Sequence, residues 1–67
     1  MSTQKYDVIP MVTVEAGARL LHNGIWLHVT SNLKSESLAG CQHVKFRETD
    51  IGTHIKSASL VCVEVEQ

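Results

Sequence analysis

The residues best able to do chemistry in this 67-residue chain are histidines and cations in short extended segments. Three segments repeat a histidine, a β-branched residue and a polar residue: His28-Val29-Thr30, His43-Val44-Lys45 and His54-Ile55-Lys56. Side chains alternate between the faces of a strand, so the pattern predicts that the three histidines share one side of a sheet. Arginine and lysine bind phosphate, and tryptophan offers a stacking surface for a base. The predicted ligand-binding set is Arg19, Trp26, His28, His43, Lys45, Arg47, His54 and Lys56.

Other kinds of chemistry have less support. Zinc sites usually combine closely spaced histidines with thiolate or carboxylate ligands, whereas these histidines stand alone on separate segments. Cys41 and His43 lie two positions apart on one predicted strand, with nothing to orient the imidazole and no oxyanion motif. The carboxylates show no acid–base pairing. We therefore expect no metal, no cofactor and no enzymatic activity.

Size and composition restrict the class of protein. A chain of 67 residues forms one small domain, and such a domain buries only about 60% of the surface of its unfolded chain. Small folds compensate with disulfides, metals or oligomerisation. The chain has two cysteines, Cys41 and Cys62, and we expect neither a secretion signal nor a membrane-spanning run from its sequence. We expect a soluble cytoplasmic homo-oligomer with reduced thiols and no membrane contact. The net charge of −1 excludes a general polyelectrolyte attraction to nucleic acid.

Asn23-Gly24 lies between two apolar runs and predicts a hairpin with a two-residue type I′ turn. In this hairpin His22 faces Ile25, Leu21 faces Trp26, Leu20 faces Leu27, Arg19 faces His28 and Ala18 faces Val29. One face then carries aliphatic residues: Ala18, Leu20, Ile25, Leu27 and Val29. The opposite face carries Arg19, Leu21, Trp26, His28 and Thr30.

A short helix over residues 14–22 is the alternative for the same stretch. Val14, Gly17, Ala18 and Leu21 follow helical spacing, and Thr13 is suited to cap the helix. Gly17 would then lie inside the helix at a cost of about 1 kcal/mol. The hairpin is the favoured interpretation, and the helix stays open as an α+β alternative.

The remaining segments also favour strands. Val8–Glu15 is rich in β-branched residues, and Pro10 requires that strand to lie at an edge or to begin near the proline. Residues 31–40 read as a polar loop with at most one helical turn, residues 41–47 as an alternating strand, 48–52 as a turn, and 53–66 as a long last strand. Residues 1–6 are expected to be frayed. The predicted fold is all-β, a small antiparallel barrel or sandwich of about five strands in a single domain, 1–67.

Assigning a core side to each strand completes the prediction. The predicted core contains Val12, Val14, Ala18, Leu20, Ile25, Leu27, Val29, Val44, Phe46, Ile55, Val61, Val63 and Val65. The outer side carries the ligand-binding set, although polar outer faces are also ordinary in antiparallel sheets. Apolar residues on this side predict contact with a second subunit: Leu21, Trp26, Ala58, Leu60 and Cys62.

Two functions are compatible with this pattern. The first is a non-enzymatic binding protein whose basic face, or the cleft between its subunits, holds RNA, single-stranded DNA or a nucleotide. The second is a protein-binding module or small inhibitor, of the size of phage or plasmid accessory proteins, that covers an acidic patch on a larger protein.

Overall fold

The structure is a computed structural model that describes residues 5–65, which form one six-stranded antiparallel sheet. The strand order is β1-β6-β2-β3-β4-β5. No α-helix occurs in the described part of the chain, and residues 19–22 of the alternative helix form a strand. The all-β prediction is therefore confirmed, with six strands in place of about five. The elements are β1 Lys5–Pro10, η1 Met11–Thr13 (a 3-10 turn), β2 Arg19–His22, β3 Ile25–Lys34, β4 Cys41–Phe46, β5 Thr53–Lys56 and β6 Leu60–Val65.

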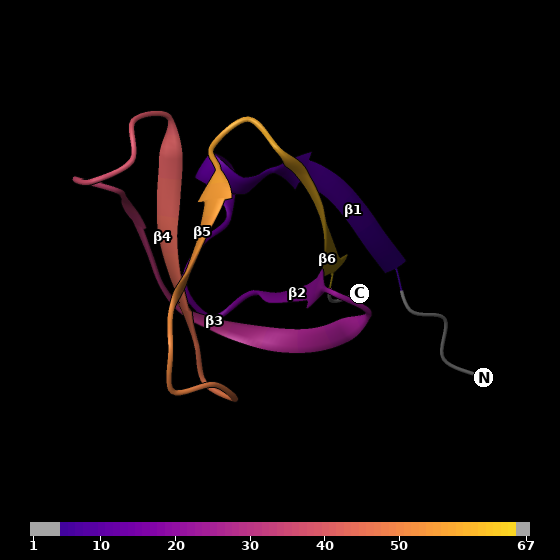
Figure 1. Cartoon of the computed structure of the whole chain (residues 1–67). Helices are drawn as coiled ribbons and strands as arrows, with labels where there is room; N and C mark the ends of the chain where they lie inside the picture. Colours follow the sequence, from indigo (N-terminus) through magenta and orange to yellow (C-terminus); the bar gives the residue numbers. More distant parts are fainter. Residues whose placement is uncertain (1–4, 66–67) are drawn as a thin grey trace.

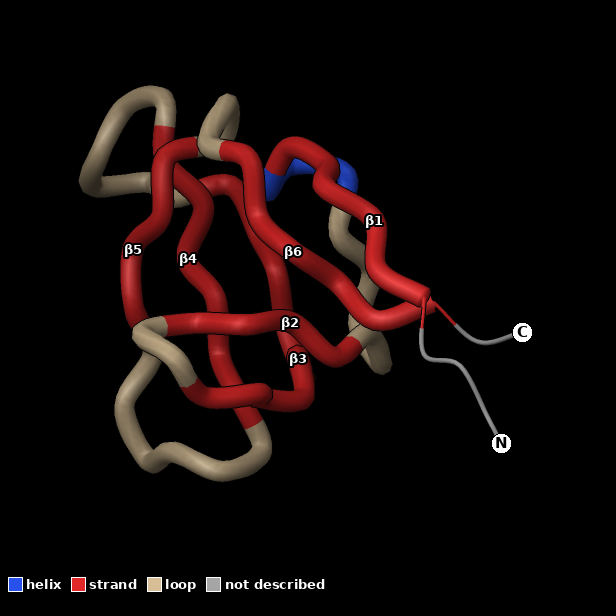
Figure 2. Tube along the Cα trace, turned by 90° about the vertical axis from the view of Figure 1, so that its right-hand side faces the viewer, coloured by secondary structure: helices blue, strands red, loops and turns tan. Residues whose placement is uncertain are grey.

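The sheet is bent into a trough that does not close into a barrel (Figure 1). β2 and β3 form its base, β4 and β5 rise on one side, and β6 and β1 rise on the other. We call these two sides the β4–β5 wall and the β6–β1 wall. Figure 2 shows the same curvature from another direction, with the loops gathered at the ends of the strands. The core fills the inside of the trough, and the outer sides of the two walls face away from each other.

The central hairpin has the predicted register, since Arg19 pairs with His28 and Leu21 pairs with Trp26. Asn23 has φ 52° and Gly24 has φ 78°, as a type I′ turn requires. Leu20 and Leu27 face each other in the core. The turn carries Ile25 beyond the end of the core, so the prediction that Ile25 is buried is wrong.

The first strand ends at Pro10, whereas the sequence predicted that it would continue through Glu15. The chain turns there because Met11 N–H donates to the carbonyl of Ser59 and Thr13 Oγ1 donates to the carbonyl of Pro10. This 3-10 turn exposes Val12 and buries Met11 completely, so the core has Met11 where Val12 was predicted. The edge position predicted for a strand containing Pro10 is confirmed, because β1 is an edge strand.

The strand at the chain start extends further than predicted. Of the segment expected to fray, Lys5 and Tyr6 already belong to β1 and pair with Val65 and Glu64. Residues 1–4 lie outside the described residues.

Two further boundaries differ from the prediction. β3 continues to Lys34 through a register shift between Val29 and Ser31, so residues 31–34 are strand and not loop. A bulge adds one residue to one strand, which exchanges the inward and outward positions that follow it. The predicted last strand is divided by a turn after Lys56 into β5 and β6, and these belong to opposite walls.

A chain of side-chain amides, one half-buried and one buried, holds the walls together. Asn32 Nδ2 donates to the carbonyls of Met11 at 2.9 Å and Val14 at 2.7 Å. Its Oδ1 accepts a hydrogen bond from Gln42 Nε2 at 3.0 Å, and Gln42 Oε1 accepts one from Ser57 Oγ at 2.8 Å. These bonds join β3, β4, η1 and the β5–β6 turn beside the core. The buried apolar core consists of Met11, Val14, Leu20, Leu27, Val29, Val44, Phe46 and Val63.

Candidate functional site

The predicted ligand-binding residues lie on the outer side of the sheet in two separate groups. Arg19, Trp26 and His28 belong to the base of the trough, on β2 and β3. The other five belong to the β4–β5 wall, where three alternate with the buried residues of β4 and two alternate with the half-buried residues of β5. These five are His43, Lys45, Arg47, His54 and Lys56. The bend of the sheet therefore divides the single basic face that the sequence predicted.

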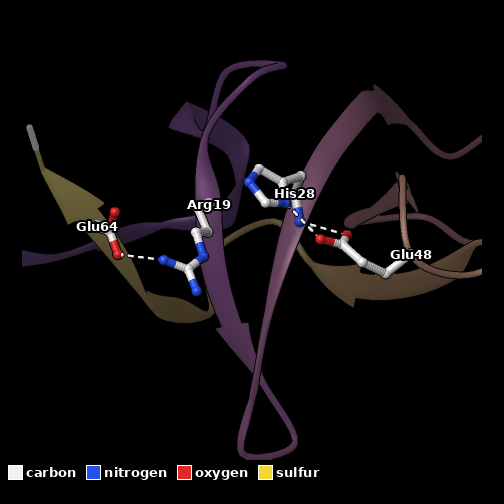
Figure 3. Close-up of polar contacts among 4 residues, drawn as sticks. All are labelled: Arg19, His28, Glu48 and Glu64. Atoms are coloured by element: carbon white, nitrogen blue, oxygen red, sulfur yellow. Dashed lines mark hydrogen bonds and ion pairs between the residues drawn. The ribbon is translucent and has the colours of Figure 1, made fainter.

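Arg19 and Trp26 already interact with other residues of the chain. Arg19 Nη1 donates to Glu64 Oε2 at 2.8 Å, an ion pair that links β2 to β6 (Figure 3). The guanidinium carbon of Arg19 lies 5.5 Å from the ring centroid of Trp26. The Trp26 ring stacks on Tyr6 with 5.3 Å between centroids. An incoming phosphate or base would have to displace these contacts.

His28 is held in the same way on the opposite side of the hairpin (Figure 3). Its backbone N–H donates to Glu48 Oε1 at 2.8 Å, and its ring Nδ1 hydrogen-bonds to Glu48 Oε2. The hydrogen bond from the imidazole, followed by the one from the backbone N–H, lowers the pKa of Glu48. Glu48 thereby ties the residues after β4 to β3.

The outer side of the β4–β5 wall centres on two stacked imidazoles. His43 pairs with His54 across the strands, and their rings stack with 4.8 Å between centroids and 16° between planes. Lys45 lies two residues from His43 on one side of the stack, and Lys56, which faces Cys41, lies on the other. Among residues 5–65, no carboxylate forms an ion pair with Lys45, Lys56 or Arg47. The wall thus presents rings between unpaired cations.

A groove of about 400 Å³ opens beside the imidazoles. We call it the imidazole groove, and its lining comprises Leu33, Lys34, Ser35, Glu36, Ser37, His43 and His54. The loop after β3 forms one side and is held by a hydrogen bond from Leu38 N–H to Ser35 Oγ, at 3.1 Å. Next to His43, a Cβ added at Gly52 would lie 2.6 Å from His43 Nε2, so the glycine gives the ring its space.

Sequence reasoning missed the groove residues contributed by the end of β3 and the segment after it. Lys34, Ser35, Glu36 and Ser37 looked like part of a polar loop, and no local pattern distinguished them from other solvated residues. Gly52 was recognised only as a turn residue. Its role beside His43 depends on the β4–β5 pairing.

The described residues offer no metal site and no disulfide. Among residues 5–65, no group of three or more histidine, cysteine or acidic side chains could hold a metal ion. Cys41 and Cys62 are free thiols on different walls. The described part of the chain has no helix of sufficient length and apolarity to cross a membrane.

No known protein family, curated protein or solved structure matches this chain.

Proposed function

We propose that the protein is a non-enzymatic module that binds single-stranded nucleic acid on the outer side of the β4–β5 wall. The observation that supports this function is the stacked pair of His43 and His54 between Lys45 and Lys56. Every base has a flat π face that stacks on an aromatic ring, and lysine contacts the phosphate backbone irrespective of sequence.

The spacing of the cations suits a strand that crosses the wall. Lys45 and Cys41 are four residues apart on β4, which corresponds to roughly 13 Å along an extended chain. Lys56 lies opposite Cys41, so the two ammonium groups lie on either side of the imidazole stack. A base stacked on an imidazole would place its flanking phosphates toward these cations, and Lys34 lies at the groove for a third contact.

The groove favours nucleic acid over an acidic protein surface. An acidic protein would use the cations but has no need of a stacked ring pair or of an adjacent groove of about 400 Å³. A splayed base has a flat shape that fits such a groove, and its exocyclic amino group would have the Glu36 carboxylate as an acceptor. The acidic-partner alternative is therefore an outcome to be tested.

The experiment is a fluorescence polarisation titration with short labelled RNA, single-stranded DNA and mononucleotides at two salt concentrations. Lys45→Glu and Lys56→Glu should each weaken oligonucleotide binding about tenfold and flatten the plot of log K against log salt by roughly 0.7. Lys5→Glu is the matched control because this exposed lysine lies on β1, in the other wall, and it should leave both quantities unchanged.

His54→Ala separates nucleic acid from an acidic protein. Loss of a stacked base should weaken oligonucleotide binding about tenfold without changing the salt slope. The protein-partner alternative predicts a different result: polyglutamate binds, its affinity falls in the Lys45 and Lys56 variants but not in His54→Ala, and nucleic acid does not bind. That result would overturn this proposal. Absence of binding to every oligonucleotide at low salt would overturn it as well.

A further inference from the structure

A continuous apolar row runs across the outer side of the β6–β1 wall and of the base. Val8 pairs with Cys62, and Leu21 pairs with Trp26. The antiparallel register of β2 and β6, set by the pair of Leu20 and Val63, brings Leu21 beside Cys62. The row therefore crosses four strands. Tyr6, two residues from Val8, and Leu60, two residues from Cys62, widen it. We call the whole set the apolar outer surface: Tyr6, Val8, Leu21, Trp26, Leu60 and Cys62.

The exposed area of this surface is large for a chain of this size. The exposed fractions are 49% for Tyr6, 63% for Val8, 38% for Leu21 and 67% for Leu60. Together these four residues leave on the order of 400 Å² of mostly apolar surface in water, which is in the range of functional patches. A stable interface buries about 800 Å² per partner, of which somewhat more than half is apolar. The apolar outer surface supplies most of that apolar share.

The charge of the surface indicates what covers it. Among residues 5–65, the charged side chains beside it are Arg19 and Glu64, which form an ion pair with each other. Lys5 and Asp7 alternate with Tyr6 and Val8 on β1, so they extend to the opposite side of the strand. The described part of the chain thus offers a charged partner no unpaired complementary charge on this surface. A second copy of the chain offers an equally neutral and apolar surface.

We propose that the apolar outer surface binds a second copy of the chain, face to face, to form a symmetric dimer. Sheets that pack face to face bury their apolar sides in a layer about 10 Å thick, which supplies the second layer that this small chain lacks. A twofold axis needs only one self-complementary patch. Since the outer sides of the walls face away from each other, both β4–β5 walls stay open in such a dimer (Figure 1).

Light scattering and sedimentation on the full chain test the dimer. The wild type should have twice the chain mass of 7.4 kDa at high concentration and dissociate on dilution. Leu60→Asp and Val8→Asp should each raise the dissociation constant at least about tenfold, because each places an unpaired charge in the interface. Both positions are solvent-exposed in the single chain, so the circular dichroism spectrum should keep its β character. Ile51→Asp is the control, since Ile51 is 82% exposed in the loop between β4 and β5.

The two cysteines give a second test that needs no substitution. Cys62 lies in the apolar outer surface, Cys41 lies on the other wall, and both are free and partly buried. A maleimide should label Cys62 at least about fivefold more slowly when the protein concentration rises above the dissociation constant. The labelling rate of Cys41 should stay constant.

Three outcomes would overturn the proposal. The first is a wild type that stays monomeric across the micromolar range. The second is a dimer whose dissociation constant does not change in either aspartate variant. The third is protection of Cys41 in place of Cys62. None of these results depends on whether the β4–β5 wall binds nucleic acid.

Discussion

The two walls of the trough use the same alternation of inward and outward residues but leave different chemistry on their outer sides. On the β4–β5 wall, Lys45 and Lys56 lie beside stacked imidazoles and make no ion pair among residues 5–65. On the β6–β1 wall, Glu64 pairs with Arg19 of the base, and apolar side chains cover the rest. Alternation decides which residues face outward. Cross-strand neighbours decide whether those residues are available to a ligand.

The largest expected effect is a loss of stability on removing the Asn32 amide, which links the two walls. Asn32→Ala removes the amide that donates to the carbonyls of Met11 and Val14 and accepts from Gln42. The Met11 carbonyl keeps the hydrogen bond from Val14 N–H, but the partly buried Val14 carbonyl and Gln42 amide each lose a partner at about 1–3 kcal/mol, so we expect a loss of about 2 kcal/mol or more in the free energy of unfolding. Urea denaturation measures this loss. Because η1 and β4 belong to different sides of the trough, oligonucleotide binding and dimer formation should weaken together.

Ser31→Ala is the control for that variant. Ser31 precedes Asn32 on the same strand and faces Lys45 on the outer side, so its loss should change the free energy of unfolding by less than about 0.5 kcal/mol. Equal denaturation midpoints for Asn32→Ala and the wild type would show that the amide chain does not join the walls.

The hairpin shows how much of the fold could be predicted from the sequence. Asn23-Gly24 fixes the turn, and the turn fixes the pairing of Arg19 with His28 and Leu21 with Trp26. Outside the hairpin, the local residue pattern was not sufficient to predict where strands end and which residues face the core. The bulge after Val29 and the 3-10 turn after Pro10 each change which residues face the core, and both depend on long-range hydrogen bonds such as Met11 N–H to the Ser59 carbonyl.

The candidate site shows the same limit. Strand parity correctly put the basic residues of β4 and β5 on the outer side, together with Arg19, Trp26 and His28. It could not show that Glu64 forms an ion pair with Arg19, or that Glu48 hydrogen-bonds to His28. These carboxylates lie 45 residues from Arg19 and 20 residues from His28 along the chain. Only the strand order brings them together.

A smaller effect should be confined to the β4–β5 wall. Gly52→Ala places a Cβ 2.6 Å from His43 Nε2, so the imidazole must move away from its stacked position. Oligonucleotide affinity should fall about fivefold, because a base then loses part of its stacking surface. The dimer should be unaffected, and the free energy of unfolding should change by less than about 1 kcal/mol. Titration and sedimentation of one sample measure both quantities.

A double-mutant cycle checks the cause of that effect. In a His43→Ala background, Gly52→Ala should bring no further loss of affinity, since the ring that it displaces is absent. Additive losses would mean that Gly52 acts through the loop between β4 and β5 and not through the imidazole.

The smallest effect concerns the contact that ties the β4–β5 wall to the base. The hydrogen bonds from His28 lower the pKa of Glu48, so this carboxylate stabilises the fold above its ordinary pKa and loses that contribution as the pH falls through its lower folded pKa. Glu48→Gln should therefore lower the thermal midpoint at neutral pH by about 4 °C or less, as for an exposed contact. The two melting curves should converge in acid, once the wild-type carboxylate is protonated. Glu36→Gln, in the groove loop, should melt with the wild type throughout. If the difference in thermal midpoint between Glu48→Gln and the wild type stays constant into acid, the charge of Glu48 does not contribute to the contact with His28.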